Sequence, residues 1–177
     1  GWPGACGSAS GGSRITTSIN VSAQQAAVPR RMAELLDRLT ATGRADRFAV
    51  ELTENALLDA AAFQHRVLPL LRRAGVRVSI DDFGTGYASL ASLLDITVEE
   101  LKIDRAFVDR IHERPRSQVI VQALTAAGRE LAVSVVAEGV ETAEELDYLL
   151  AETSIGIAQG YLFATPMTLD ELLAGRD

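Results

Sequence analysis

Short runs of β-branched and apolar residues, each ending in polar residues, recur six times along the chain and predict β-strands. These runs are Ile15 to Ser22, Phe48 to Glu54, Val76 to Asp82, Leu101 to Asp104, Val133 to Glu138 and Ile155 to Tyr161. Stretches with apolar residues at helical spacing separate or follow them. They are Gln24 to Ala41, Asp59 to Ala74, Tyr87 to Leu94, Arg116 to Leu131, Ala143 to Ala151 and Leu169 to Ala174. The chain therefore alternates strands and helices.

Alternating strands and helices predict an α/β fold with a mostly parallel sheet, either open and doubly wound or closed as a TIM-type (β/α) barrel. Glycines near predicted helix ends, Gly43 and Gly75, and an N-cap residue, Thr142, support the element boundaries. A TIM-type barrel closes with eight strands in about 250 residues, so six strands in 177 residues fall roughly one or two units short.

Composition indicates one globular domain, because 47% hydrophobic residues in 177 suffice for a core. Residues 1–13 are rich in Gly and Ser and predict a flexible lead-in to a domain covering residues 14–177. The net charge of −7 disfavours a DNA or RNA polymer as partner. No apolar run approaches the roughly 18–20 residues of a membrane span, and the lone Cys6 excludes an internal disulfide. We expect a cytoplasmic location.

Carboxylates and a few other polar residues gather where the predicted strands end. The set comprises Asn20, Glu51, Glu54, Asp81, Asp82, Lys102, Asp104, Glu138, Glu141 and Gln159. Active sites of parallel α/β folds lie at this end of the strands. Converging carboxylates repel one another without a cation, and oxygen ligands suit Mg²⁺ or Mn²⁺, so the pattern predicts a divalent metal site. Lys102, the single Lys among 17 basic residues, is positioned to orient a water or to offset developing charge.

Each of these residues also has an ordinary structural interpretation. Glu54 or Glu141 alone is more often a helix N-terminal charge, and Asn20 or Gln159 alone often satisfies backbone groups at a strand end. Asp81 and Asp82 would lie on opposite faces of a strand unless the chain turns there, and the Gly-rich segment after them supplies a turn. The whole set at six strand ends favours a functional site over these alternatives.

Six ordered segments resemble the motifs of EAL domains. They are Ile19-Asn20-Val21-Ser22-Ala23, Glu51-Leu52-Thr53-Glu54, Asp81-Asp82-Phe83-Gly84-Thr85-Gly86-Tyr87, Leu101-Lys102-Ile103-Asp104-Arg105, Ala137-Glu138-Gly139-Val140-Glu141-Thr142 and Gln159-Gly160-Tyr161. The resemblance covers the chain from about Ile15 onward. It implies a TIM-type barrel that hydrolyses cyclic di-GMP to linear pGpG with Mg²⁺ or Mn²⁺ at a two-metal site.

The resemblance also implies a role for each matching residue. Asn20, Glu51 and Asp81 would bind one metal, and Asp81, Asp82 and Glu138 would serve the second, with Asp104 nearby. Lys102 would hold the attacking water. Glu54 would anchor the Asp82 to Tyr87 loop, which orders the metal site and a dimer interface, and Glu141 and Gln159 would support the pocket.

The chain departs from the family at one motif, because it contains no Glu-Ala-Leu. The resemblance places the metal-binding glutamate of that motif on an earlier strand, so we expect an N-terminally incomplete barrel, as a fragment rather than a natural short form. Unpaired strand edges would then favour association, and we expect a homodimer through an exposed edge or the Asp82 to Tyr87 loop. The alternatives are a catalytically inactive cyclic di-GMP receptor or interaction module and, less favoured by the motif order, another metal-dependent barrel enzyme such as an enolase-type lyase.

Overall fold

The computed structural model describes residues 16–53, 63–84 and 98–174. Six strands form one sheet, and every neighbouring pair is parallel. The strands are β1 (Thr17–Val21), β2 (Phe48–Thr53), β3 (Arg77–Phe83), β4 (Glu100–Ile103), β5 (Ser134–Ala137) and β6 (Ile157–Ala158). Each lies within or one residue beyond its predicted run, and β6 is much shorter than its run.

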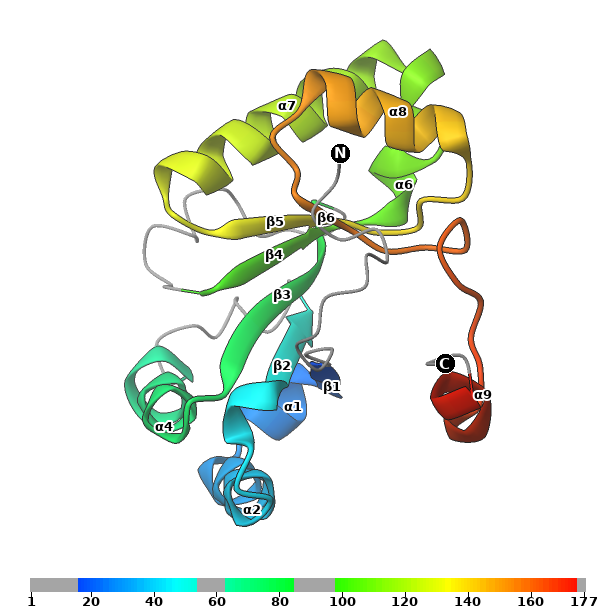
Figure 1. The fold of residues 1–177 in the computed structure, drawn as a ribbon. Coiled ribbons are helices and arrows are strands. Elements are labelled where there is room, and N and C mark those ends of the chain that lie inside the picture. The colour runs from blue at the N-terminus through cyan, green and yellow to red at the C-terminus, as the bar shows by residue number, and fades with distance from the viewer. Residues whose placement is uncertain (1–15, 54–62, 85–97, 175–177) are drawn as a thin grey trace.

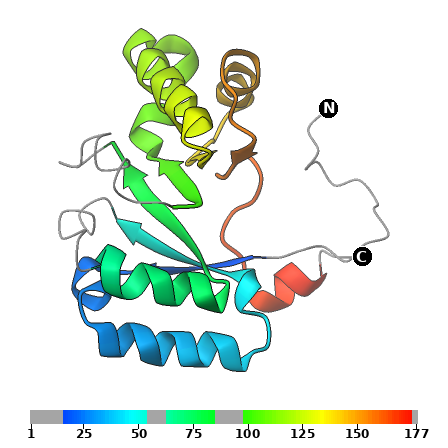
Figure 2. The same ribbon diagram turned by 90° about the vertical axis from the view of Figure 1, so that its left-hand side faces the viewer.

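The order of the strands in the sheet is the order of the strands in the chain, from β1 to β6. A doubly wound sheet reverses its strand order at a switch point, whereas a TIM-type sheet adds each new strand on the same side. The structure therefore confirms the predicted α/β fold of TIM type with six strands. The sheet curves, and the helices between its strands lie along the outside of the curve, whereas the last helix, Leu169–Ala174, stands apart from them (Figures 1 and 2).

Helices connect β1 to β2, β2 to β3, β4 to β5 and β5 to β6, whereas most of the connection between β3 and β4 lies outside the described residues. The α-helices are α1 (Ala23–Ala26), α2 (Pro29–Ala41), α4 (Leu68–Ala74), α6 (Arg105–Val108), α7 (Pro115–Glu130), α8 (Ala143–Glu152) and α9 (Leu169–Ala174). A π-helical turn, Phe63–Val67, precedes α4, and 3₁₀ turns cover Ala45–Arg47 and Ile111–Glu113. No helix in these described ranges is long and apolar enough to cross a bilayer.

Two helix predictions need correction. The single helix expected from Gln24 to Ala41 is two helices, because Pro29 holds the preceding Val28 in an extended conformation (φ −105°, ψ 97°) and starts α2 without an N–H to donate. The short α6 was missed; Asp104 caps it by accepting a hydrogen bond from the amide of Ala106 at 2.7 Å. The predicted lead-in 1–13 and the helix from Tyr87 to Leu94 lie outside the described residues.

The hydrophobic core lies between the sheet and the helices. In β2 the buried Val50 and Leu52 are on one face, and Glu51 between them is on the other. Buried leucines of α2, α4, α7 and α8 join the same core cluster. The alternation of side chains thus leaves a second, polar face of the sheet, on which the buried Glu51, Ser79 and Lys102 lie. That face carries the candidate site.

Candidate functional site

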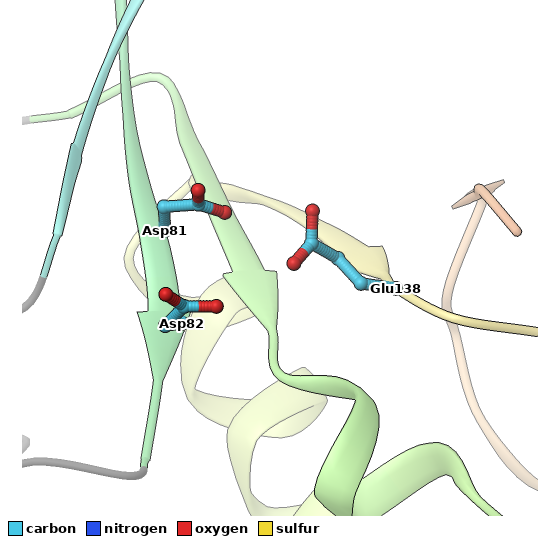
Figure 3. Close-up of side chains that lie close together, drawn as sticks. All are labelled: Asp81, Asp82 and Glu138. Atoms are coloured by element: carbon cyan, nitrogen blue, oxygen red, sulfur yellow. The ribbon is translucent and has the colours of Figure 1, made fainter. Parts of the chain in front are cut away.

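Acidic side chains from two strands meet at the C-terminal end of the sheet. Asp81 and Asp82 lie just before Phe83, the last residue of β3, and Glu138 follows β5 directly. Each offers one oxygen atom, and the three oxygens all lie within 4.8 Å of one another. Figure 3 shows the two aspartates extending from β3 toward Glu138, which extends back toward them. The parallel sheet therefore brings residues 57 positions apart in sequence (138 minus 81) to one point.

A local distortion lets both aspartates contribute. Asp82 has φ 54°, in the left-handed region that Asp tolerates better than most residues, and the pairing of β3 with β4 shifts register between Ile80 and Phe83. Consecutive residues of a regular strand would place their side chains on opposite faces. The regular strand conformation is thus interrupted at Asp82 itself, and the second half of the predicted turn, Thr85 and Gly86, lies outside the described residues.

Lys102 is the cation of this acidic group. Its ammonium Nζ lies 2.7 Å from Glu51 Oε1, 2.8 Å from Glu138 Oε1 and 3.4 Å from Asp81 Oδ1. The residue is only 6% exposed, and Glu51 is 5% exposed. One ammonium on β4 therefore joins carboxylates from β2, β3 and the end of β5.

Crowded negative charge shifts several pKa values. Burial, together with the charges of Asp81 and Asp82, raises the pKa of Glu138 to about 7 although Lys102 opposes the shift. Desolvation, the charges of Asp81 and Asp104, and a hydrogen bond with Asp104 raise the pKa of Asp82. Burial alone would lower the pKa of Lys102, but its hydrogen bonds to Glu138 and Glu51 and the charge of Asp81 raise it. The acids therefore exceed the charge that Lys102 can balance, which is the condition that favours a bound cation.

An open pocket of about 500 Å³ lies beside the acids. Asp82, Asp104, Glu138, Glu141, Gln159 and Arg105 contribute its polar side chains, and Gly139, Gly160 and residues 161 and 164–166 complete its lining. The Gln159 amide donates a hydrogen bond to Glu138 Oε1. Arg105 Nη1 lies 3.0 Å from Glu141 Oε1. Among the described lining residues, Arg105 is thus the one cation facing four carboxylates.

The structure places the predicted residues in three groups. It brings Asp81, Asp82, Glu138 and Lys102 together, with Glu51 held by Lys102. Asp104, Glu141 and Gln159 line the adjoining pocket. Asn20 lies on the outer strand β1, where it is exposed and pairs in register with Glu51 of β2. Glu54 lies outside the described residues. Within the described ranges, the three-carboxylate group does not include Glu51 or Asp104.

Two residues of the site escaped the sequence prediction. Arg105 follows the predicted Asp104 directly but was considered only as part of a motif. Glu145, in the first turn of α8, is not among the predicted residues, yet it is 2% exposed and accepts three backbone hydrogen bonds. The Thr142-x-x-Glu145 spacing is a capping-box signature, which could have indicated the contacts of Glu145 at the start of α8 but not its contact with Arg110.

Comparisons with known proteins identify a family and several similar chains. A family model described as the EAL domain matches residues 6–166. NbdA of Pseudomonas aeruginosa, a cyclic di-GMP phosphodiesterase, is 39% identical over 92% of this chain and 21% of its own length. The EAL domain of Mycobacterium smegmatis DcpA is 33% identical with a TM-score of 0.84, over 90% of this chain and 72% of that one. Klebsiella pneumoniae BlrP1, in a calcium and cyclic di-GMP complex, is 36% identical with a TM-score of 0.78, over 85% and 39%.

A second BlrP1 structure is similarly alike, and the curated relatives are much longer than this chain. A manganese and cyclic di-GMP complex of BlrP1 gives a TM-score of 0.77. The chain spans about a fifth of the length of the first curated relatives it matches, 19% in each of three cases.

Proposed function

Because the chain belongs to the EAL domain family, we propose that it is a metal-dependent phosphodiesterase that hydrolyses cyclic di-GMP to linear pGpG. The observation that carries the proposal is the group formed by Asp81, Asp82 and Glu138, whose oxygens lie within 4.8 Å of one another beside an open pocket. Similar chains bearing the name cyclic di-GMP phosphodiesterase support the choice of substrate.

The donor set fits Mg²⁺ or Mn²⁺. Both ions prefer carboxylate oxygens, and the raised pKa values of Asp82 and Glu138 mark an excess of negative charge at this point. We propose Asp81, Asp82 and Glu138 as ligands of one ion, and Asn20, Glu51 and Asp81 as ligands of a second, with Asp104 nearby. The calcium and manganese complexes of BlrP1 support a divalent ion in the family. When bound, such ions would supply positive charge to the phosphodiester and acidify a water.

The other predicted site residues have proposed roles in orienting the attacking water and in positioning their neighbours. Lys102, held between carboxylates of three elements, would orient the attacking water and retain positive charge throughout. Gln159 restricts Glu138 through its amide, and Glu141 holds Arg105 at the pocket wall. Glu54, which lies outside the described residues, would anchor the Asp82 to Tyr87 loop, as the resemblance to EAL domains implies.

The proposed function is tested by incubating the 177-residue chain with cyclic di-GMP and Mn²⁺, and by following linear pGpG by chromatography. A D81N variant serves as the matched control, because it removes one ligand and leaves the fold's apolar core untouched. We expect Mn²⁺-dependent product from the wild-type chain and none from D81N. Linear product that forms equally in the presence of a chelator would contradict the proposal.

A receptor that binds cyclic di-GMP without hydrolysing it is the second candidate. Support for it comes from the similar solved structures that are complexes with cyclic di-GMP, because binding of the dinucleotide does not by itself require hydrolysis. Calorimetric titration separates the two functions: saturable binding of cyclic di-GMP with Mn²⁺ but no pGpG over hours would establish the receptor.

We also propose that the chain forms a homodimer. β1 and β6 are the outer strands of the described sheet, and Ile157, Tyr161 and Phe163 near β6 are 47%, 60% and 51% exposed. Exposed apolar side chains beside an outer strand favour pairing with a second copy. Light scattering after size-exclusion chromatography measures the oligomeric state, and a monomer at high micromolar concentration would refute the homodimer.

Two further predictions are not tested by the described residues. The predicted interface at the Asp82 to Tyr87 loop lies largely outside them, and the cytoplasmic location remains a prediction.

A further inference from the structure

Glu145, in the first turn of α8, is a buried carboxylate that the proposed chemistry does not use. It is 2% exposed. Its Oε1 accepts a hydrogen bond from the Arg110 amide at 2.8 Å, and its Oε2 accepts from the Glu141 amide at 2.8 Å and the Thr142 amide at 3.1 Å. Burial would raise the pKa of Glu145, but these backbone donors lower it below its ordinary value. The side chain is therefore held as a carboxylate among amides.

The amides that Glu145 binds belong to two different connections of the sheet. Arg110 lies 35 positions earlier, in the connection that follows β4 and carries Asp104. Glu141 and Thr142 lie in the connection that follows β5 and carries Glu138. Arg110 has φ 49°, an unfavourable conformation for a residue other than glycine. A neighbouring contact must maintain it, and the hydrogen bond to Glu145 is such a contact.

The segment from Glu138 to Glu141 is held on two further sides. A Cβ built on Gly139 would lie 2.5 Å from Cγ of Arg105, so backbone and side chain are in direct contact there. The Val140 amide donates to the carbonyl of Gln159 at 3.1 Å, and the Leu162 amide donates to the carbonyl of Val140 at 3.1 Å. These contacts fix the segment against α6 and against the residues that follow β6. Glu145 supplies the third attachment, from the helix side.

We propose that Glu145 is a positioning residue, which locks the connections after β4 and β5 together and thereby fixes Glu138 against Asp81 and Asp82. The inference rests on the proposed function, because it deepens the account of that same site. Residues that orient metal ligands without touching the ion typically affect metal affinity or activity by about 10–100-fold.

The variant E145Q isolates this role. A glutamine side chain retains one oxygen, which still accepts from the amides of Glu141 and Thr142 as in a capping box. Its NH₂ group is a donor and then faces the Arg110 amide, so the bond between the two connections is lost. E144Q is the matched control, because Glu144 is exposed in the same helical turn and carries the same charge. T142A is a second control, because it removes the hydroxyl cap but leaves the Arg110 bond intact.

Three measurements test the proposal at a temperature well below each variant's Tm. We expect Mn²⁺ affinity by calorimetry to fall about 10–100-fold in E145Q relative to E144Q. We expect T142A to lower Tm without this loss. Amide hydrogen exchange at Arg110 and Glu141 should accelerate about tenfold or more in E145Q.

The outcomes separate two kinds of failure. Equal Mn²⁺ affinity in E145Q and E144Q would overturn the proposal, and faster exchange without a loss of affinity would do the same, because Glu145 would then serve only stability. A wild-type chain that binds Mn²⁺ but forms no pGpG would instead refute the proposed function, and the affinity comparison would still decide the role of Glu145.

Discussion

Replacing Lys102 with methionine tests whether one buried ammonium balances the acidic group. Methionine fills a similar volume but removes the contacts at 2.7 Å to Glu51, 2.8 Å to Glu138 and 3.4 Å to Asp81. Removing one partner from a buried charge network typically costs about 3–5 kcal/mol, because the remaining charges stay buried without compensation. We expect K102M to lower the free energy of unfolding by about 3 kcal/mol at pH 8, the lower end of this range, because Glu138 is able to take up a proton.

The pH dependence of K102M follows from the same reasoning. The pKa of Glu138 is about 7 with Lys102 present, and loss of the ammonium raises it further. A carboxyl group whose folded-state pKa exceeds its unfolded value binds more protons in the folded state, so stability falls as pH rises through that interval. The difference between wild type and K102M should therefore shrink from pH 8 to pH 6. Added Mn²⁺ should restore K102M more than wild type, because it replaces the lost positive charge.

Thermal and urea unfolding measure the effect. For a chain of this size, about 3 kcal/mol corresponds to a fall in Tm of roughly 6–12 °C. R105M is the matched control: its pair with Glu141 at 3.0 Å is at the surface, where such pairs contribute about 0–1 kcal/mol. A metal-free K102M as stable as R105M at pH 8 would refute the assignment of Lys102 as the balancing cation.

The remaining predictions concern the metal ligands and the packing of the loop after β5. E138Q should weaken Mn²⁺ binding by roughly 100-fold or more, measured by calorimetry, because a direct ligand matters at least as much as its supporting residues; an unchanged affinity would remove Glu138 from the ligand set. Wild-type Mn²⁺ affinity should fall by up to about tenfold per unit as pH drops below about 7, because Glu138 must release its proton to bind, and a constant affinity from pH 6 to 8 would contradict this. G160A should destabilise the chain by about 1–3 kcal/mol, because its Cβ would lie 2.1 Å from the carbonyl oxygen of Val140, whereas G156A meets nothing within 4 Å; equal unfolding midpoints for the two variants would show that the backbone yields.

Much of the fold could be predicted from the sequence because apolar runs and their polar ends coincide with the strands. The run Val76 to Asp82 became Arg77–Phe83, and the predicted helix Leu169 to Ala174 agrees with α9. The break at Pro29 was foreseeable from proline's effect on the residue before it, but helical periodicity continues across it and concealed it. Local signals therefore located the elements more reliably than their interruptions.

The site was predictable in composition but not in geometry. Strand-end acids indicated a metal site, since parallel strands deliver their C-terminal residues to one edge. That Asp82 adopts φ 54° depends on the pairing of β3 with β4, which no local pattern encodes. The contact between Glu145 and Arg110 could not be predicted for a related reason, because the two residues are 35 positions apart in the sequence. An acid in the first turn of a helix is readily explained by the helix dipole alone.

The single lysine of the chain gains a physical explanation from this geometry. The other 16 basic residues are arginines, which suit exposed positions and planar, bidentate partners. At position 102 the partners are three carboxylate oxygens that belong to different parts of the sheet. An ammonium offers three donors around one compact centre, whereas a guanidinium directs its donors within one plane. The centre of the acidic group therefore requires lysine, and the same requirement for compact positive charge makes this point suitable for a divalent ion.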